Sequence, residues 1–154
     1  MPKEIERKFL VKNEDWRPGH KAVEIRQGYM CSDKLRTVRV RTKGDKSYLT
    51  IKGPNKGMER DEFEYEIPFE DATYMLGTMC EQPLIEKRRF EIKHAGKIWE
   101  VDEFFGDNAG LIVAEVELES ASDEVEKPDW IGEEVTEDAR YYNSSLSRTP
   151  FTKW

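Results

Sequence analysis

The stretch KEIERKFLV, residues 3–11, alternates charged side chains with apolar ones. Glu4, Glu6 and Lys8 fall on one face, and the opposite face is mainly apolar but includes Arg7. Successive side chains of a strand point to opposite faces of a sheet, so this spacing predicts a strand with two acids and a base on one face. Alone, such a strand is interpreted as the solvated edge of a sheet. For Arg7, on the face opposite the acids, we expect a surface ion pair. Matching neighbours would instead make it the wall of a site.

Seven further stretches show the same period-two alternation, which predicts a mainly β (α+β) fold. Turn sequences at residues 43–46, 94–97 and 106–110 are short enough for hairpins, so we expect antiparallel neighbours. Eight strands linked in this way favour a closed barrel, because closure removes the exposed sheet edges. The expected strands are Lys3–Val11, Ala22–Met30, Leu35–Lys43, Ser47–Lys52, Met58–Ile67, Leu84–Lys93, Lys97–Phe105 and Leu111–Glu119.

Helical segments are few and short. Amphipathic spacing predicts a helix at Asp71–Cys80, a capping arrangement predicts one at Ser120–Glu126, and the tail contains one more at Asp138–Arg148. We expect these helices to pack outside the barrel, over its apolar faces, and at one end. No repeat or linker divides the sequence, so residues 1–154 are expected to form a single domain.

The charge of the chain excludes several classes of protein. Charged residues make up 37% of the 154 residues and the net charge is −7, against about 25% charged residues in ordinary globular proteins. No basic block typical of nucleic-acid binding occurs, and no apolar run has the length of a membrane span or a signal core. We therefore expect a cytoplasmic protein, monomeric or homodimeric, with no nucleic-acid or membrane partner.

Whole faces of the predicted strands carry charge of one sign. Glu62 and Glu64 share one strand face, whereas Arg39 and Arg41 share another. Like charges so close together are unfavourable unless something compensates them. A solvated face is the simple alternative for any single strand, but such a face tolerates neutral polar residues freely. Charged faces that point inward would line a wet tunnel.

Such a tunnel needs a cation and an anion to balance its charges. A hard divalent cation such as Mg²⁺ takes oxygen ligands, which suits the carboxylates of Glu4, Glu6, Glu115 and Glu117. An anion with several phosphoryl groups suits the basic set, since Arg donates in bidentate fashion. That set is Arg39, Arg41, Lys52, Lys87 and Arg89. A metal that bridges carboxylates and phosphates is typical of phosphoryl transfer.

The charged motifs also occur in a characteristic order. Glu4-Ile5-Glu6-Arg7-Lys8 is followed by Arg39-Val40-Arg41, Thr50-Ile51-Lys52, Glu62-Phe63-Glu64, Glu86-Lys87-Arg88-Arg89, Val101-Asp102, Glu115-Val116-Glu117 and a tail motif at residues 132–141. This series resembles the CYTH superfamily, the triphosphate tunnel metalloenzymes, over nearly the whole chain. The resemblance implies an eight-stranded antiparallel tunnel that binds a linear triphosphate and Mg²⁺ or Mn²⁺.

The resemblance also implies roles for individual residues. Metal contacts fall to Glu4, Glu6 and Glu117, with Glu115 and Asp102 as further candidates. Phosphate contacts fall to Lys8, Arg39, Arg41, Lys52, Lys87 and Arg89. Glu62 and Glu64 would hold a second metal or orient the attacking water, and with Lys87 they are the candidates for catalysis. Arg140 in the tail is a further substrate-binding candidate, with a surface ion pair as the alternative.

The expected function is a divalent-metal-dependent triphosphatase that hydrolyses inorganic tripolyphosphate to phosphate and diphosphate, with nucleoside or thiamine triphosphates as further substrates. The preference for a bare triphosphate rests on a short chain without a nucleoside-reading insertion. Two alternatives stay open. A class IV-like adenylate cyclase would convert ATP to cyclic AMP. A non-catalytic polyphosphate- or nucleotide-binding module would need no metal, and the full acidic set argues against it.

Overall fold

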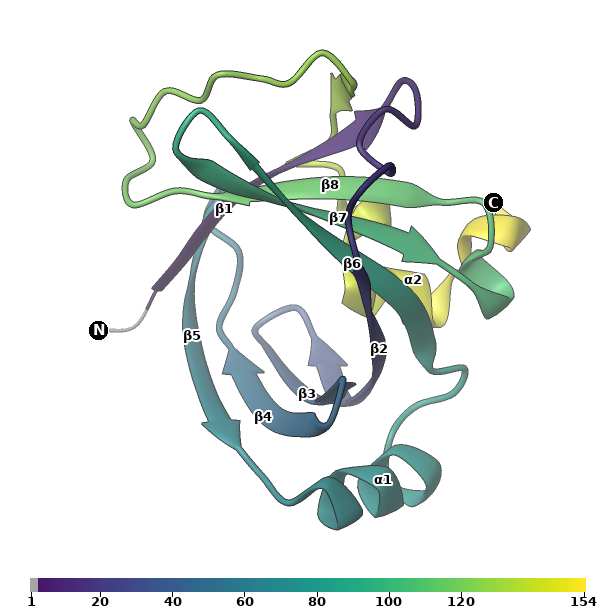
Figure 1. Ribbon diagram of the computed structural model, residues 1–154. Coiled ribbons are helices and arrows are strands. Elements are labelled where there is room, and N and C mark those ends of the chain that lie inside the picture. Colours follow the sequence, from purple (N-terminus) through teal and green to yellow (C-terminus); the bar gives the residue numbers. More distant parts are fainter. Residues whose placement is uncertain (1–2) are drawn as a thin grey trace.

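The computed structural model describes residues 3–154, which form a ring of antiparallel strands with a few short helices outside it (Figure 1). The strands are β1 (Lys3–Val11), β2 (Ala22–Asp33), β3 (Arg36–Lys43), β4 (Lys46–Lys52), β5 (Glu59–Glu66), β6 (Ile85–His94), β7 (Lys97–Phe104), β8 (Ile112–Glu117) and β9 (Ile131–Glu134). The helices are α1 (Phe69–Thr78) and α2 (Asn143–Arg148), with 3-10 turns at Gly106–Asn108, Ala139–Tyr141 and Phe151–Lys153. The predicted eight-stranded barrel is confirmed, and the strand bounds agree within a few residues.

The first strand closes the ring. The hydrogen-bonded order is β5-β4-β3-β2-β6-β7-β8-β1, and β1 pairs back onto β5 through Lys3–Asp61, Glu4–Arg60 and Ile5–Glu59. The second half of β1 changes partner and pairs with β9, where Phe9 lies opposite Glu134. Arg7 donates two hydrogen bonds to Glu134, with its Nε at 2.9 Å from Oε2. This is the surface ion pair that the sequence predicted.

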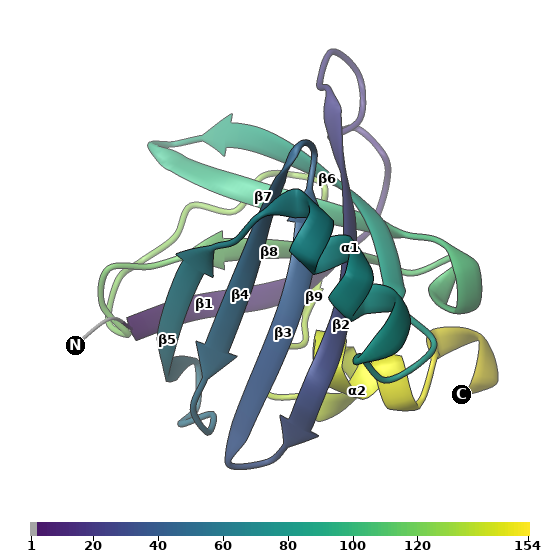
Figure 2. The same cartoon turned by 90° about the horizontal axis from the view of Figure 1, so that it is seen from below.

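Loops as well as helices cover the apolar outer faces. Helix α1 packs on β3 and β4, burying Ala72 and Leu76 against Val40 (Figure 2). On the opposite side, Trp99 of β7 contacts Phe9 and Trp130 with ring centroids 5.5 and 6.0 Å apart. Trp130 precedes β9 in an irregular segment, so loops share with the helices the covering of the apolar faces.

Two expected helices differ from the structure. Residues 120–126 form a turn followed by irregular backbone, because the Asp123 carboxylate accepts hydrogen bonds from the backbone N–H groups of Glu119 and Ser120, which competes with helix formation. The expected tail helix is split at Tyr142, whose extended backbone (φ −68°, ψ 136°) separates a 3-10 turn from α2. Strand β9 was not predicted, because four residues (IGEE) are too few to show alternation.

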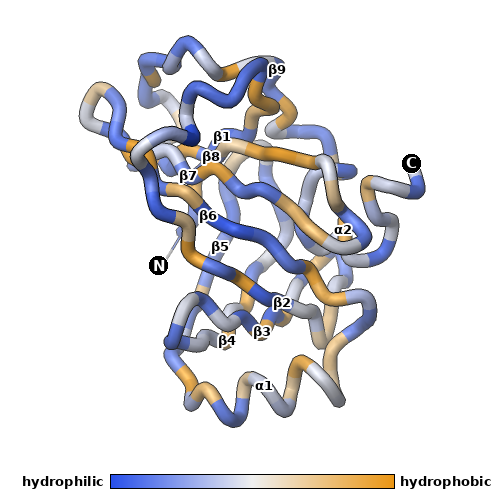
Figure 3. Tube along the Cα trace, turned by 45° about the vertical axis from the view of Figure 1, so that its right-hand side comes forward, coloured by the Kyte–Doolittle hydropathy of each residue, from blue (hydrophilic) through white to orange (hydrophobic). Residues whose placement is uncertain are grey.

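The tail, residues 135–154, packs against one end of the barrel (Figures 1 and 2). Leu146 of α2 and Tyr141 are buried in a cluster with Ile85 and Phe104 at the ends of β6 and β7. Hydropathy alternates along the strands, with blue and orange residues in turn (Figure 3). Among the described residues, no helix has the length and apolar character needed to cross a membrane.

The aromatic cluster outside the barrel is expected to carry much of the stability. Trp99 is fully buried, so Trp99→Ala should lower the free energy of unfolding by about 3–5 kcal/mol. Ile98, its neighbour on β7, is 48% exposed, and Ile98→Ala should change that energy by less than about 0.5 kcal/mol. Urea unfolding of both variants tests this. A loss at position 99 no larger than at position 98 would contradict the packing described here.

Candidate active site

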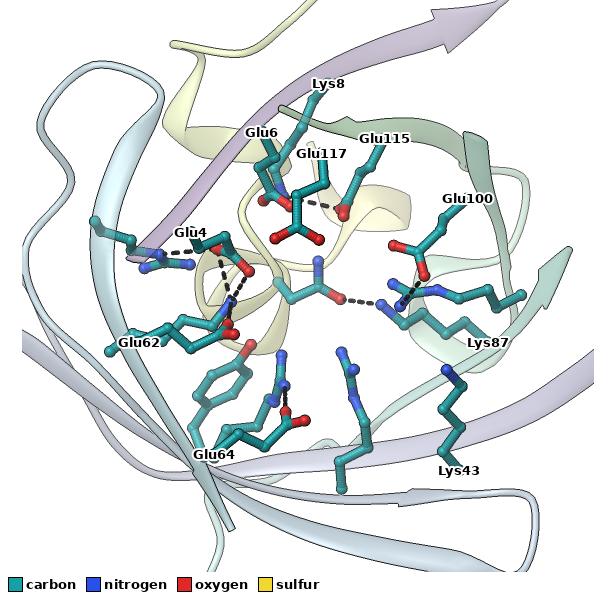
Figure 4. A pocket seen from close by; sticks show the side chains of 17 residues that line it. Glu4, Glu6, Lys8, Lys43, Glu62, Glu64, Lys87, Glu100, Glu115 and Glu117 are labelled. Carbon is teal, nitrogen blue, oxygen red and sulfur yellow. Dashed lines mark hydrogen bonds and ion pairs between the residues drawn. The ribbon is translucent and has the colours of Figure 1, made fainter. Parts of the chain in front are cut away.

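The barrel encloses a cavity of about 210 Å³ whose lining residues are all charged or polar. The side chains labelled in Figure 4 point from different strands toward a common centre. We refer to this cavity as the tunnel. Most of the site residues expected from the sequence line it: Glu4, Glu6, Lys8, Arg39, Arg41, Lys52, Glu62, Glu64, Lys87, Arg89, Glu115 and Glu117.

Carboxylates crowd together where β1 meets β8. Glu6 lies opposite Glu117 across the two strands, and Glu115 lies opposite Lys8. The Lys8 ammonium is 3.1 Å from Glu115 Oε1 and 3.6 Å from Glu6 Oε1. One ammonium cannot balance the three acids. Burial and the Glu115 charge therefore raise the pKa of Glu6 to about 8, and burial and Glu4 raise the pKa of Glu117.

A second acid–base group lies between β1 and β5. The Lys52 ammonium is 3.0 Å from Glu4 Oε2 and 3.2 Å from Glu62 Oε2. Burial opposes ionisation of Glu4, but the charges of Lys52 and Arg60 outweigh it and hold the pKa of Glu4 well below its usual range. Burial and the neighbouring Glu4 raise the pKa of Glu62. Beside Lys52, Glu4 is therefore ionised over a wider range of pH than Glu62.

The donor set fits a hard divalent cation, although the carboxylates do not converge on one point. Within residues 3–154, no three His, Cys, Asp or Glu side chains lie close enough together to hold a metal. The acids instead pair with ammonium groups, as Glu4 does with Lys52. Yet Glu6 and Glu117 face each other with raised pKa values. Burial raises both pKa values, together with the charge of Glu115 at Glu6 and of Glu4 at Glu117, and a divalent cation with oxygen ligands would offset this accumulated negative charge.

The opposite side of the tunnel carries surplus positive charge. Arg41 donates from Nε to Gln27 Oε1 at 2.8 Å and makes no ion pair among the described residues. Arg39 donates to Thr50 at 3.2 Å and lies 3.5 Å from the Glu64 carboxylate, but its buried Nε has no hydrogen-bond partner within the described chain. Burial and the charges of Arg39 and Arg89 lower the pKa of Arg41 to about 9. This side is suited to an anion that accepts several hydrogen bonds.

Asp102, an expected metal contact, is not among the residues that line the tunnel and instead pairs with two of the cations. Its side chain is 1% exposed. It accepts two hydrogen bonds from Arg89, at 2.8 and 2.9 Å, and its Oδ2 forms an ion pair with Lys87 Nζ at 2.7 Å, so both oxygens are occupied. Despite this partner, burial and the charges of Arg89 and Arg41 lower the pKa of Lys87 to about 7.

Arg140, the expected substrate contact in the tail, is not among the residues that line the tunnel. Its side chain is 62% exposed and pairs with Asp138 at 2.8 Å. Its guanidinium also lies 4.8 Å from the centroid of the Trp154 ring. The alternative weighed for this residue, a surface ion pair, is the one that the structure shows.

Sequence reasoning missed several residues that line the tunnel. Arg60, Lys43 and Glu100 share the inward phase of their strands with predicted site residues, so the alternation could have identified them. Tyr29 and Asn143 gave no such signal. Asn143 begins α2, and its Oδ1 accepts a hydrogen bond from Lys87 Nζ at 3.0 Å. Its position depends on how the tail packs against the barrel.

Comparisons with known proteins agree with this geometry. The sequence model of the CYTH domain matches residues 2–150. The chain belongs to the CYTH family. It is 50% identical over 151 residues to the inorganic triphosphatase of Acetivibrio thermocellus, which covers 98% of this chain and 97% of that protein. It is 39% identical to the inorganic triphosphatase of Nitrosomonas europaea, with 94% and 96% covered.

A solved CYTH-like structure has the same fold. The crystal structure of an inorganic triphosphatase aligns with a TM-score of 0.68 at 34% identity, and the alignment covers 96% of this chain and 95% of that one. CYTH triphosphatases depend in general on divalent metals, which agrees with the crowded carboxylates of this CYTH protein.

The raised pKa of Glu6 gives a testable effect on stability. The pKa in the fold, about 8, exceeds the ordinary value of 4.5, so the fold prefers the protonated carboxyl. The resulting stabilisation is present below pH 4.5 and is lost between pH 4.5 and about 8. Glu6→Gln should therefore stabilise the metal-free protein at pH 9 by at least about 1 kcal/mol, or roughly 2–4 °C in Tm.

Thermal unfolding in chelator at pH 5, 7 and 9 measures this effect. The difference in Tm between Glu6→Gln and the unaltered protein should grow with pH. Glu91→Gln, an exposed carboxylate near the end of β6, is the control and should show no such trend. A constant difference for Glu6→Gln across the three pH values would contradict the crowding of acids described here.

Proposed function

We propose that this protein is a divalent-metal-dependent triphosphatase that hydrolyses inorganic tripolyphosphate to phosphate and diphosphate, with Mg²⁺ or Mn²⁺ as its cofactor. The observation that carries the proposal is a closed tunnel whose acidic and basic sides both lack sufficient partners. A linear polyphosphate with a divalent cation supplies both missing charges. The names of the relatives, inorganic triphosphatases, support the same activity.

The lining of the tunnel favours a bare triphosphate over a nucleotide. Tyr29 is the single aromatic residue that the described chain contributes to the lining, and it is buried beside Gln27 and Arg39. A base or thiazole ring therefore meets charged groups rather than an apolar surface on which to stack. Inorganic tripolyphosphate is our preferred substrate, and nucleoside and thiamine triphosphates are weaker candidates.

Basic side chains bind and orient the phosphates. The guanidinium groups of Arg39, Arg41 and Arg89 can each donate two hydrogen bonds in a planar fork, which fixes the direction of the anion. Lys8, Lys52 and Lys87 add point charges around it. Lys87 and Arg89 are held from behind by Asp102, so their positions change little when the anion binds. We assign Lys87 to charge stabilisation at the reacting phosphoryl group.

The acidic side holds the metal and directs the water. Glu4, Glu6, Glu115 and Glu117 are the proposed metal ligands, and the cation supplies charge neutralisation at the phosphoryl oxygens. Glu62 and Glu64 orient the attacking water or hold a second metal. Glu62 suits the role of general base because burial and Glu4 raise its pKa. The water then attacks a terminal phosphorus in line with the leaving diphosphate.

Product analysis tests the proposed function. The purified protein is incubated with tripolyphosphate, ATP or thiamine triphosphate, each with Mg²⁺, Mn²⁺ or chelator. We expect phosphate and diphosphate from tripolyphosphate, only with metal. Cyclic AMP and diphosphate from ATP would indicate a cyclase instead. Binding of tripolyphosphate without turnover would indicate a non-catalytic module, and either result would overturn the proposal.

Two variants separate the proposed roles of acids and bases. Glu6→Ala should lower kcat at limiting metal by at least about 100-fold, because a metal ligand is lost. Arg41→Ala should raise KM by about 10–100-fold, because a bidentate anion contact is lost. Arg88→Ala is the matched control, since Arg88 is exposed and points away from the tunnel on β6. Steady-state kinetics measures all three.

The control should keep kcat and KM within about twofold of the unaltered protein. A full rate for Glu6→Ala at limiting metal would show that the metal assignment is wrong. An unchanged KM for Arg41→Ala would remove Arg41 from the substrate site.

A further inference from the structure

A chain of hydrogen bonds crosses the end of the tunnel where the tail packs. Lys87 Nζ donates to Asn143 Oδ1 at 3.0 Å, and Gln27 Nε2 donates to the same oxygen at 3.0 Å. Gln27 Oε1 in turn accepts from Arg41 Nε at 2.8 Å. Two amides from β2 and α2 thus join two cations from β3 and β6. Figure 4 shows the bond at Lys87 as a dashed line.

The two cations determine how both amides must face. Arg and Lys side chains only donate hydrogen bonds. Gln27 must therefore turn its oxygen to Arg41, which leaves its N–H₂ group for Asn143. Asn143 must then turn its oxygen to both Gln27 and Lys87. Its own N–H₂ group makes no hydrogen bond within residues 3–154, although the residue lines the tunnel.

We propose that Asn143 is a substrate-binding residue that donates its side-chain amide to a phosphoryl oxygen and orients Lys87 for the same anion. The inference rests on the proposed function and extends its site to the tail. Lys87 has three N–H donors; it donates one hydrogen bond to Asn143 at 3.0 Å and forms an ion pair with Asp102 at 2.7 Å. Donor capacity is thus left for the substrate. Gln27 fixes Arg41 in the same way without lining the tunnel.

An amide suits this position better than a charged group. A cation here would add to the repulsion between Lys87 and Arg41, whose pKa values are already lowered. A carboxylate would pair with those cations and repel the anion. The amide satisfies both donors and keeps two N–H groups for phosphate. Burial of Leu146 and the bond from Ser147 Oγ to the Pro83 carbonyl hold α2 in place.

Two variants of Asn143 test the proposal. Asn143→Asp keeps the shape and both acceptor contacts but places a carboxylate where the N–H₂ group was. Asn143→Leu keeps a similar volume and removes every hydrogen bond. The probe is imidotriphosphate, a tripolyphosphate analogue that resists hydrolysis, titrated calorimetrically in the presence of Mg²⁺. We expect at least tenfold weaker binding for Leu and a still larger loss for Asp, with a matching rise in KM for tripolyphosphate.

Ser144→Ala is the matched control, because Ser144 is the next residue of α2 and lines a different cavity, between the tail and the β2–β3 turn. It should bind the analogue as the unaltered protein does. Binding is compared at a temperature well below the Tm of every variant, so that each protein is folded. Binding by Asn143→Asp or Asn143→Leu within twofold of the control would overturn the inference. If the unaltered protein binds the analogue but hydrolyses no triphosphate, the proposed function fails while the inference is still decided by the variants. If it does not bind the analogue at all, both fail.

Discussion

The burial of unbalanced charge inside a closed barrel is the constraint on which the structure depends. Glu6 faces Glu117 across β1 and β8, while Arg41 on the other side has an amide for its hydrogen-bond partner. A dry core could not hold these groups, since an unpaired buried charge costs more than a domain of this size can supply. The interior must therefore contain water, and its charged groups are suited to binding an anion and a cation rather than to forming a packed core.

As a consequence, the apolar core lies outside the barrel. Lys8 and Phe9 are consecutive and both buried, one facing the tunnel and the other facing Trp99. Strand β1 is thus covered on both faces, although its sequence alternates like a half-exposed strand. Helix α1 and the irregular segment around Trp130 cover the outer faces of the barrel. The tail closes one end of the barrel and places Asn143 beside the charged side chains of the tunnel. Each strand thus presents apolar side chains that stabilise the fold on its outer face and charged side chains of the site on its inner face.

Local patterns predicted what local geometry determines. The alternation of side chains along a strand fixes which residues share a face, so the inward set from Glu4 to Glu117 followed from the sequence. Contacts between distant segments did not. Asp102 has the inward phase of Glu100, but its place behind Lys87 and Arg89 depends on the register between β6 and β7. Asn143 and β9 depend on the path of the tail, which has no periodicity to read.

Direct observation of the ligands in the tunnel would test the central claim, that acids and bases on opposite walls hold a metal and a polyphosphate together. The measurement is a crystal structure with imidotriphosphate and Mn²⁺, with the metal located by its anomalous scattering. The account predicts Mn²⁺ coordinated by carboxylates of β1 and β8, and phosphoryl oxygens on Arg39, Arg41 and Arg89. A structure in which the anion binds only to the outer surface and the tunnel holds neither anion nor metal would contradict this account.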